Sequence, residues 1–257
     1  RPAAVVAIAE KGYADFELKA TGEPGHSSSP PRSTAIGILA RAIQAVEDHP
    51  MPATLDTAAG QTLDYIAPEA KPAFRVLLAN RWLADPIIMR VMQSKPASSA
   101  TVRTVCSANV IEGGVKSNQL PQSARAVVNC RLIPGDTAEK VAAHFARVIG
   151  DSRVKVNILT ADNASPEAPP ESAAGQALKT ALRQIYPEAI YVPSLAIGAT
   201  DGRYFAALTP NVYRFSPIHV TPETLKQMHG PAEHISVEDA KTAVRFYAQL
   251  ILNLCGR

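Results

Sequence analysis

The stretch Tyr13-Ala14-Asp15-Phe16-Glu17-Leu18-Lys19-Ala20 has an apolar residue at every second position from Ala14 onward, with charged residues between them. Because successive side chains of a strand point to opposite faces, this period of two predicts a half-buried β-strand. A loop rich in Gly, Pro and Ser follows at residues 22–31, and Ser33 or Thr34 can then cap a helix. That helix would end before His49-Pro50 and carry its apolar face on Ile36, Leu39, Ile43 and Val46.

Two further alternating segments, 101–108 and 124–132, predict two more strands of the same sheet. A helix that starts at Asp136 or Thr137 and stops at Gly150 follows them, and Val154, Val156 and Ile158 indicate a last strand. Residues 51–96 interrupt this series with helix-like segments. The order β-α-β-β-α-β with one helical insertion predicts a ferredoxin-like fold.

A second unit follows an exposed connection at residues 162–171. Ser172 can cap a helix, residues 190–192 and 211–215 can form strands, and a Gly-flanked polar turn at 198–205 opens a short helix. This unit has about 100 residues and two or three strands. The fold class is therefore mixed, α+β with α/β, and the second unit is only part of an α/β domain.

Composition excludes several classes of protein. The 257 residues are 46% hydrophobic and carry a net charge of only +3, without the long basic run of a nucleic-acid surface. No apolar run approaches the ~20 residues of a membrane segment. Cys106 and Cys130 lie in strand-like runs where small buried thiols are common, so we expect no disulfide framework. Arg1-Pro2 resembles neither a translation start nor a signal peptide, and we expect a truncated beginning.

The segment Met228–Ser236 puts an imidazole, that of His229, on a tight Gly-Pro turn just before a helix. Ser236 and Asp239 predict the N-terminal cap of that helix, and apolar residues then recur at helical spacing. A histidine in such a place is either a ligand or a solvated loop residue.

Five motifs, in this order along the chain, resemble the M20 metallopeptidases, and most of all the carboxypeptidase S and aminoacylase type. They are Gly25-His26-Ser27-Ser28, Gly113-Gly114-Val115-Lys116-Ser117-Asn118, Asn129-Cys130-Arg131-Leu132, Thr200-Asp201-Gly202-Arg203 and His229-Gly230 with Glu233. The resemblance implies a ferredoxin-like lid and dimerisation domain at 12–160, with its helical insertion at 51–96. It also implies that 1–11 and 161–257 belong to a zinc-binding catalytic domain.

The resemblance implies a cofactor of two zinc ions in the intact protein, with His229 as the last metal ligand. The family's other ligands and its general base come from a His-x-Asp motif and a Glu-Glu pair, and neither occurs in this sequence. A single histidine cannot hold a metal well, so we expect the chain alone to be inactive.

The lid histidine of the family corresponds to His26, which would reach the active site of a partner subunit and stabilise an oxyanion. Asn118 and Arg131 correspond to residues that hold the substrate carboxylate or carbonyl, and Thr200 and Asp201 to a pair at the pocket edge. Alternatives remain for each: His26 as an exposed loop residue, Asn118 as a turn residue, Arg131 as a surface charge. Asp201 could instead cap the short helix and pair with Arg203.

Two functions are consistent with these patterns. The first is a metal-dependent amide hydrolase that cleaves N-acyl amino acids or small peptides and forms a homodimer through its lid. The second is a non-enzymatic ferredoxin-like module that dimerises or binds a small molecule. Dimerisation would use an uncovered edge strand of the lid, unless Phe74, Trp82 and Ile87 of the insertion cover that edge.

Overall fold

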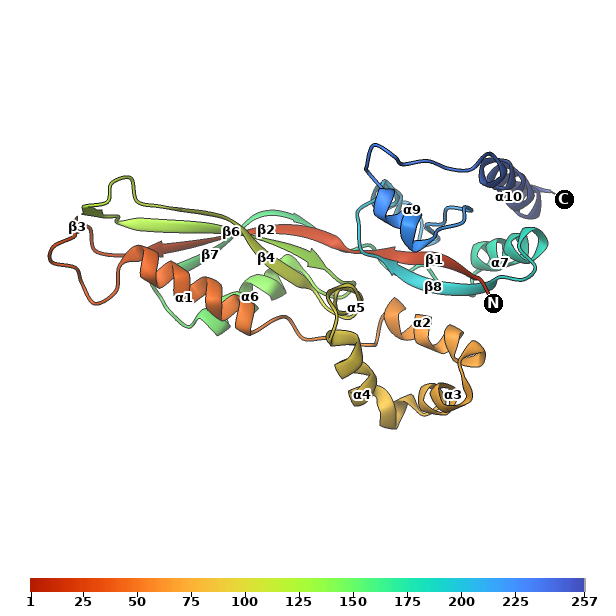
Figure 1. Cartoon of the computed structure of the whole chain (residues 1–257), viewed down its shortest axis with the longest axis horizontal. Helices are drawn as coiled ribbons and strands as arrows, with labels where there is room; N and C mark the ends of the chain where they lie inside the picture. Colours follow the sequence, from red (N-terminus) through yellow and green to blue (C-terminus); the bar gives the residue numbers. More distant parts are fainter. Residues whose placement is uncertain (257) are drawn as a thin grey trace.

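The computed structural model describes residues 1–256. Its larger sheet has four antiparallel strands in the order β4-β6-β2-β7. These strands are β2 (Gly12–Thr21), β4 (Val105–Gly113), β6 (Ser123–Leu132) and β7 (Val154–Asp162). Helices α1 (Ala35–Asp48) and α6 (Ala138–Ile149) share one core with the sheet (Figure 1). The predicted β-α-β-β-α-β order is confirmed, and it forms an open ferredoxin-like sheet.

The alternation in β2 decides which face of the sheet is buried. Ala14, Phe16, Leu18 and Ala20 are fully buried, and the ring of Phe16 packs edge-on against Phe145 of α6 at 5.3 Å between centroids. Burial of each large apolar side chain stabilises the fold by about 1.5–3 kcal/mol. The expected inner face of α1 is shifted slightly, because Ile36 is 43% exposed while Ile38 and Ala42 are buried.

Local capping signals fix the ends of α1 and α6. The hydroxyl of Thr34, not of Ser33, accepts a hydrogen bond from the backbone N–H of Gly37 at the start of α1. Thr137 caps α6 in the same way, and Gly150 ends it in the left-handed conformation with φ of 59°. These ends agree with the sequence prediction.

Residues 51–104 contain the expected helical insertion, which runs longer than predicted. It comprises α2 (Ala58–Ile66), the 3₁₀ turn η1 (Ala67–Glu69), α3 (Pro72–Ala79), α4 (Arg81–Gln93) and α5 (Pro96–Val102). The expected strand at 101–108 is therefore wrong at its start. Pro96 presets the first turn of α5, and the fully buried Val102 packs with Leu55 and Ile88 of the insertion. This packing overrides the short alternation.

The smaller sheet pairs β1 (Ala3–Glu10) with β8 (Ile190–Ala196) in parallel. The expected strand at 211–215 contributes one bridge, in which Ala7 and Arg214 exchange two backbone hydrogen bonds of 2.9 Å. The helices of this unit are α7 (Ala173–Ile185), α8 (Gly202–Phe205), α9 (Pro222–Gln227) and α10 (Val237–Cys255). None of the helices in residues 1–256 combines the length and the apolar character needed to cross a membrane.

The two sheets are continuous through Lys11 and Gly12, because β1 runs directly into β2 (Figure 1). A Cβ atom at position 12 would lie 2.4 Å from the backbone N of Ala164 and 2.4 Å from the carbonyl O of Asp162. Only glycine therefore fits where the outgoing connection crosses the beginning of β2.

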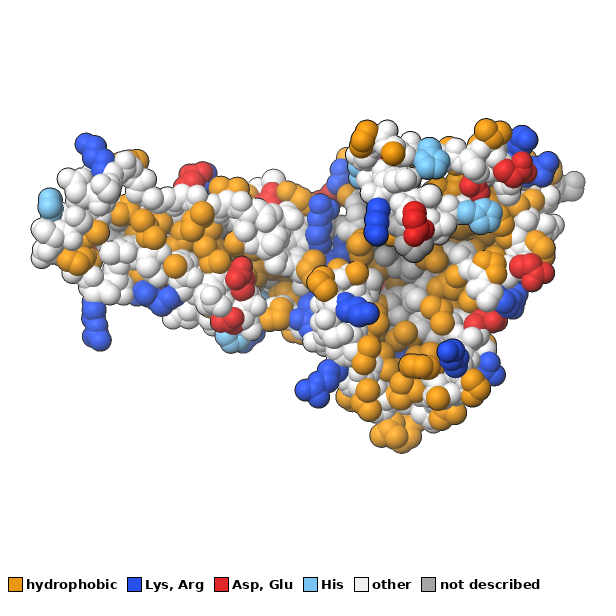
Figure 2. Space-filling view, viewed as in Figure 1, with side chains coloured by type: hydrophobic (Ala, Val, Ile, Leu, Met, Phe, Trp, Pro, Cys, Tyr) orange, Lys and Arg blue, Asp and Glu red, His pale blue; other side chains and the backbone are white. Residues whose placement is uncertain are grey.

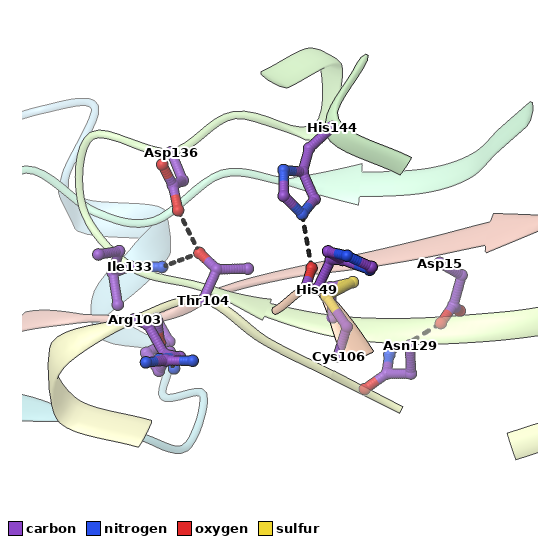
Figure 3. The surroundings of a disulfide bond; sticks show 11 residues. Asp15, His49, Arg103, Thr104, Cys106, Asn129, Ile133, Asp136 and His144 are labelled. Atoms are coloured by element: carbon purple, nitrogen blue, oxygen red, sulfur yellow. Dashed lines mark hydrogen bonds between the residues drawn. A yellow bond between two sulfur atoms is a disulfide. The ribbon is translucent and has the colours of Figure 1, made fainter. Parts of the chain in front are cut away.

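Cys106 and Cys130 form a disulfide, contrary to the expectation of two free thiols (Figure 3). They are directly opposed in the β4–β6 register, with 4.1 Å between their Cα atoms. This spacing is typical of the close, non-hydrogen-bonded pairs of an antiparallel ladder. The sequence shows that each cysteine lies in a strand, but it does not show the register that brings them together. Cys255 is free and exposed.

Candidate functional site

A buried polar network lies where β1 and β8 end, and Glu10 is at its centre. Glu10 is the last residue of β1 and is only 1% exposed. Its Oε2 accepts hydrogen bonds from the backbone N–H of Thr200 (3.0 Å), the Thr200 hydroxyl (2.5 Å) and Nε of Arg214 (2.9 Å). A charge this deeply buried requires such partners, because desolvation disfavours an isolated carboxylate.

The network fastens the polar turn after β8 to three other segments of the chain. The Ser165 hydroxyl accepts from the Glu10 backbone N–H at 3.0 Å and from the Arg214 guanidinium at 3.2 Å. The Thr200 hydroxyl in turn accepts from the backbone N–H of Gly202 at 3.1 Å. We refer to Glu10, Ser165, Thr200 and Arg214 as the junction cluster. A Cβ atom at Gly202 would lie 2.8 Å from Nε of Arg214, so a larger residue there would displace the Arg214 side chain.

Arg131 lies on β6, at the end of the large sheet where β2 begins. It is paired in register with Tyr13, and its guanidinium carbon stands 5.0 Å from the centre of the Tyr13 ring. The Tyr13 hydroxyl donates to Asp15 at 2.7 Å, and that hydrogen bond is the main reason why the pKa of Tyr13 is raised. Arg131 takes part in no ion pair within residues 1–256. The N–H groups of its guanidinium are therefore available to bind a ligand.

Lys11 connects the short link between β1 and β2 to the end of the helical insertion. It is 3% exposed, and its ammonium donates to the carbonyl oxygens of Ala100 (2.7 Å) and Arg103 (2.9 Å) at the end of α5. Burial, reinforced by the positive charge of Arg131, lowers the pKa of Lys11 to about 8.

Asp201 does not share the fixed position of Thr200. It is exposed, and its side chain makes no capping hydrogen bond to α8. Arg203 pairs with Asp162 at 2.8 Å, not with Asp201, and stacks on Tyr204 at 4.8 Å. The capping and pairing alternatives for Asp201 are both absent from the structure, which leaves its carboxylate directed to solvent.

His26 and Asn118 come together at the far end of the four-stranded sheet. His26 is in β3 (Gly25–His26), which pairs with β5 (Gln119–Leu120), and the backbone N–H of Ser27 donates to the Asn118 carbonyl at 3.2 Å. The N–H of Ser28 donates to Nδ1 of His26 at 3.2 Å. A neutral His26 therefore carries its proton on Nε2, which is free to donate.

The two ends of the sheet are well separated. From Ser123 to Arg131, β6 advances about 27 Å at roughly 3.4 Å per residue, and Figure 1 places β3 at the opposite end from β1 and β8. The predicted site residues thus form two groups. His26 and Asn118 lie at the tip, whereas Thr200 belongs to the junction cluster and Arg131 lies at the same end of the large sheet.

His229 is exposed in the loop between α9 and α10 and has a positive φ of 61°. Its backbone N–H donates to Oε2 of Glu233 at 3.0 Å. The cap of α10 is confirmed, since the Ser236 hydroxyl accepts from the N–H of Asp239 at 3.0 Å. Across residues 1–256, no three His, Cys, Asp or Glu side chains converge as a metal centre would require.

Comparison with known proteins agrees with this architecture. The family model for the peptidase dimerisation domain of M20 peptidases matches residues 8–157, which include the whole four-stranded sheet except the end of β7. The chain belongs to the M20 peptidase family. It matches the N-fatty-acyl-amino acid synthase/hydrolase PM20D1 of Homo sapiens at 37% identity over 257 residues, covering 98% of this chain and 51% of that protein.

Other M20 relatives give a consistent picture. A probable carboxypeptidase S-like 2 of Dictyostelium discoideum is 35% identical, over 98% of this chain and 49% of its own length. The M20 family metallo-carboxypeptidase Sso-CP2 of Sulfolobus solfataricus has a crystal structure that covers 97% of this chain, with a TM-score of 0.62 and 16% identity. That likeness supports the fold. The chain spans about half the length of the curated relatives it matches.

Sequence reasoning missed three residues of the junction cluster, namely Glu10, Ser165 and Arg214. The available signal was Glu10 at the end of an apolar run, Val5–Ala9, where an acidic side chain must either turn to solvent or find a buried partner. The partner, Arg214, is 204 residues away.

Proposed function

We propose that this chain supplies the lid and part of the catalytic domain of an M20 amide hydrolase that acts on N-acyl amino acids or small peptides. In this proposal residues 12–160 form the lid, and residues 1–11 and 161–257 belong to the catalytic domain. The names of the relatives, N-fatty-acyl-amino acid synthase/hydrolase and carboxypeptidase S-like protein, support this substrate class.

The observation that carries the proposal is the distance between the tip and the junction cluster. His26 and Asn118 lie at the tip, beyond the start of β6 at Ser123, and β6 advances about 27 Å from Ser123 to Arg131 by the rise of a strand. They can serve one substrate only if the tip of a second copy reaches the junction cluster of the first. A homodimer with shared active sites follows.

The edges of the lid favour such a dimer. β4 and β7 are the outer strands of the sheet, and an uncovered edge is a template for pairing with another chain. Phe74, Trp82 and Ile87 could have covered an edge, but they are 61%, 82% and 60% exposed on the helical insertion.

Each residue then has a defined task. Arg131 holds the substrate carboxylate, because a planar guanidinium donates two parallel hydrogen bonds to it. The junction cluster keeps Thr200 and the Asp201 turn in place at the pocket edge. His26 of the partner copy donates its Nε2 proton to the oxyanion of the tetrahedral intermediate, with Asn118 beside it.

M20 metallopeptidases are metal-dependent, and we assign His229 as one ligand of that metal centre. The residues of this chain do not fit a complete zinc site, since the structure gathers no further ligands around His229 within residues 1–256.

Complementation between inactive variants tests the shared site. In the complete protein, His26→Ala and Arg131→Ala are each expected to abolish most activity. Equal mixing produces one half heterodimers, and each has one intact site, so about a quarter of wild-type activity should return if His26 acts on its neighbour. Mixed dimers that form and stay inactive would refute the sharing of sites.

A dimerisation or binding module without catalysis is the second candidate for this chain by itself, and the absence of a ligand cluster in residues 1–256 favours it. Calorimetric titration with zinc tests whether the chain by itself can hold a metal. We expect no ordered binding at sub-micromolar affinity, since a zinc site needs at least three protein ligands. Tight stoichiometric binding would overturn this expectation.

A further inference from the structure

The outer surface of α3 and α4 is unusually apolar. Figure 2 shows hydrophobic side chains gathered over the part of the molecule where Figure 1 labels these helices. We call this surface the outer patch. Its members, with their exposed fractions, are Phe74 (61%), Val76 (66%), Trp82 (82%), Leu83 (67%), Ile87 (60%) and Val91 (65%).

Helical spacing shows how the outer patch adjoins the core of the insertion. Leu83, Ile87 and Val91 follow one another at intervals of four residues and therefore form one line along α4. Ala84 and Ile88, each one residue after a member of this line, are 4% and 7% exposed, so the packed face lies about 100° further round the helix. α4 is thus apolar beyond its packed face, and an exposed apolar surface of this kind marks an interaction site.

The charge of this segment indicates what it contacts. Residues 71–95 contain five basic side chains and one acidic side chain, a net charge of 5 − 1 = +4, in a chain whose total is +3. The rest of the chain therefore carries 3 − 4 = −1. Arg81 is paired with both Asp85, at 3.1 Å, and Asp64 of α2, at 2.8 Å. The other basic side chains of the segment take part in no ion pair within residues 1–256, and these are Lys71, Arg75, Arg90 and Lys95.

We propose that the outer patch docks on an anionic lipid surface. Helices that lie in a membrane interface combine Trp, Phe and Leu on one face with Lys and Arg around it. The exposed Trp82 fits the headgroup region, where amphipathic rings are enriched, and each nearby Lys or Arg adds electrostatic attraction to anionic lipid.

Charge argues against a second copy as the occupant. A two-fold contact places the same patch on both partners, so it would bring two segments of +4 together. The position of α3 and α4 also suits a flat surface. They form the end of the helical insertion that points away from both sheets (Figure 1).

The chain contains one tryptophan, Trp82, so its intrinsic fluorescence reports on the outer patch alone. We would titrate the protein with vesicles of phosphatidylcholine containing one third phosphatidylglycerol, and with vesicles of pure phosphatidylcholine. The emission of Trp82 should shift to the blue with the anionic vesicles, and the protein should sediment with them. Binding to the neutral vesicles should be much weaker.

Two variants separate the contributions. Arg75→Gln with Arg90→Gln should weaken binding about 25-fold, since each basic residue near the surface contributes roughly fivefold. Ile87→Glu should abolish the shift. Val115→Glu is the matched control, because Val115 is 92% exposed on the loop after β4 and should leave binding unchanged. All these side chains are exposed, and circular dichroism checks that the variants fold.

Several results would overturn the proposal. Equal binding to neutral and anionic vesicles would show that electrostatic attraction does not contribute. Unchanged binding by Ile87→Glu would show that the outer patch is not the docking surface. A blue shift that grows with protein concentration in the absence of vesicles would identify a second copy as the occupant. An emission maximum that is already blue-shifted in dilute protein would mean that protein covers Trp82.

Discussion

Replacing Glu10 by glutamine should destabilise the protein far more than replacing Glu112, an exposed glutamate of β4. The side chains of Glu10 and Arg214 are 2% and 10% exposed, and their ion pair is 2.9 Å long. Removal of one partner leaves a buried guanidinium without its counter-charge, which costs about 3–5 kcal/mol. The backbone N–H and hydroxyl of Thr200 also lose a charged acceptor.

The measurement is urea unfolding followed by circular dichroism, with Glu112→Gln as the control. Glu112 also pairs with an arginine, Arg125 at 2.8 Å, but its side chain is 56% exposed, so its loss should cost about 0.2–1 kcal/mol. The double variant Glu10→Gln with Arg214→Met should recover part of the loss, because it removes both charges. If Glu10→Gln lowers the free energy of unfolding no more than Glu112→Gln does, the ion pair of Glu10 with Arg214 does not stabilise the contact between their two segments.

Three further predictions follow from the same region. The pKa of Lys11 is about 8 in the folded protein, against an ordinary value of 10.5. Between these values the unfolded chain binds more protons than the folded one, so the contribution of Lys11 to the free energy of unfolding rises with pH. Urea unfolding at pH 8 and pH 10 should show this rise in the wild type and its loss in Lys11→Met. Gly12→Ala should lower the thermal midpoint strongly, since its Cβ would meet the Asp162 carbonyl at 2.4 Å, whereas Gly135→Ala, with no atom within 4 Å of its Cβ, should act only through its φ of 92°. Arg131→Lys in the complete enzyme should lower kcat/KM for an N-acyl amino acid about tenfold to a hundredfold, because a charged bidentate contact is lost; an equal loss on the carboxamide analogue would show that Arg131 does not bind the carboxylate.

Sequence periodicity was sufficient for the central strands β2 and β6. The alternation in β2 and β6 predicts which side chains are buried, because the side-chain period of a strand is two wherever it packs. Thr34, Thr137, Ser172 and Ser236 each cap a helix as predicted, since capping involves only residues within one turn. Local chemistry thus determined the elements and their order.

The helical insertion shows where local signals fail. Thr101 and Val102 read as the start of a strand, yet they end α5, because Val102 is buried against residues from α2 and α4. The outer patch was equally hidden in the sequence. Trp82 and Ile87 are apolar members of a helix-like segment, and only the packing decides that Ala84 and Ile88 are buried while Trp82 and Ile87 are exposed.

Local sequence patterns predict the ferredoxin-like strand and helix order, the helix ends and the motif order typical of M20 peptidases. The Cys106–Cys130 pair, the burial of Glu10 against Arg214 and the placing of β3 far from β1 emerge only in the folded chain. The difference arises because periodicity and capping act over a few residues. Register between strands and the pairing of buried charges depend on segments that meet only after the chain has folded, up to 204 residues apart.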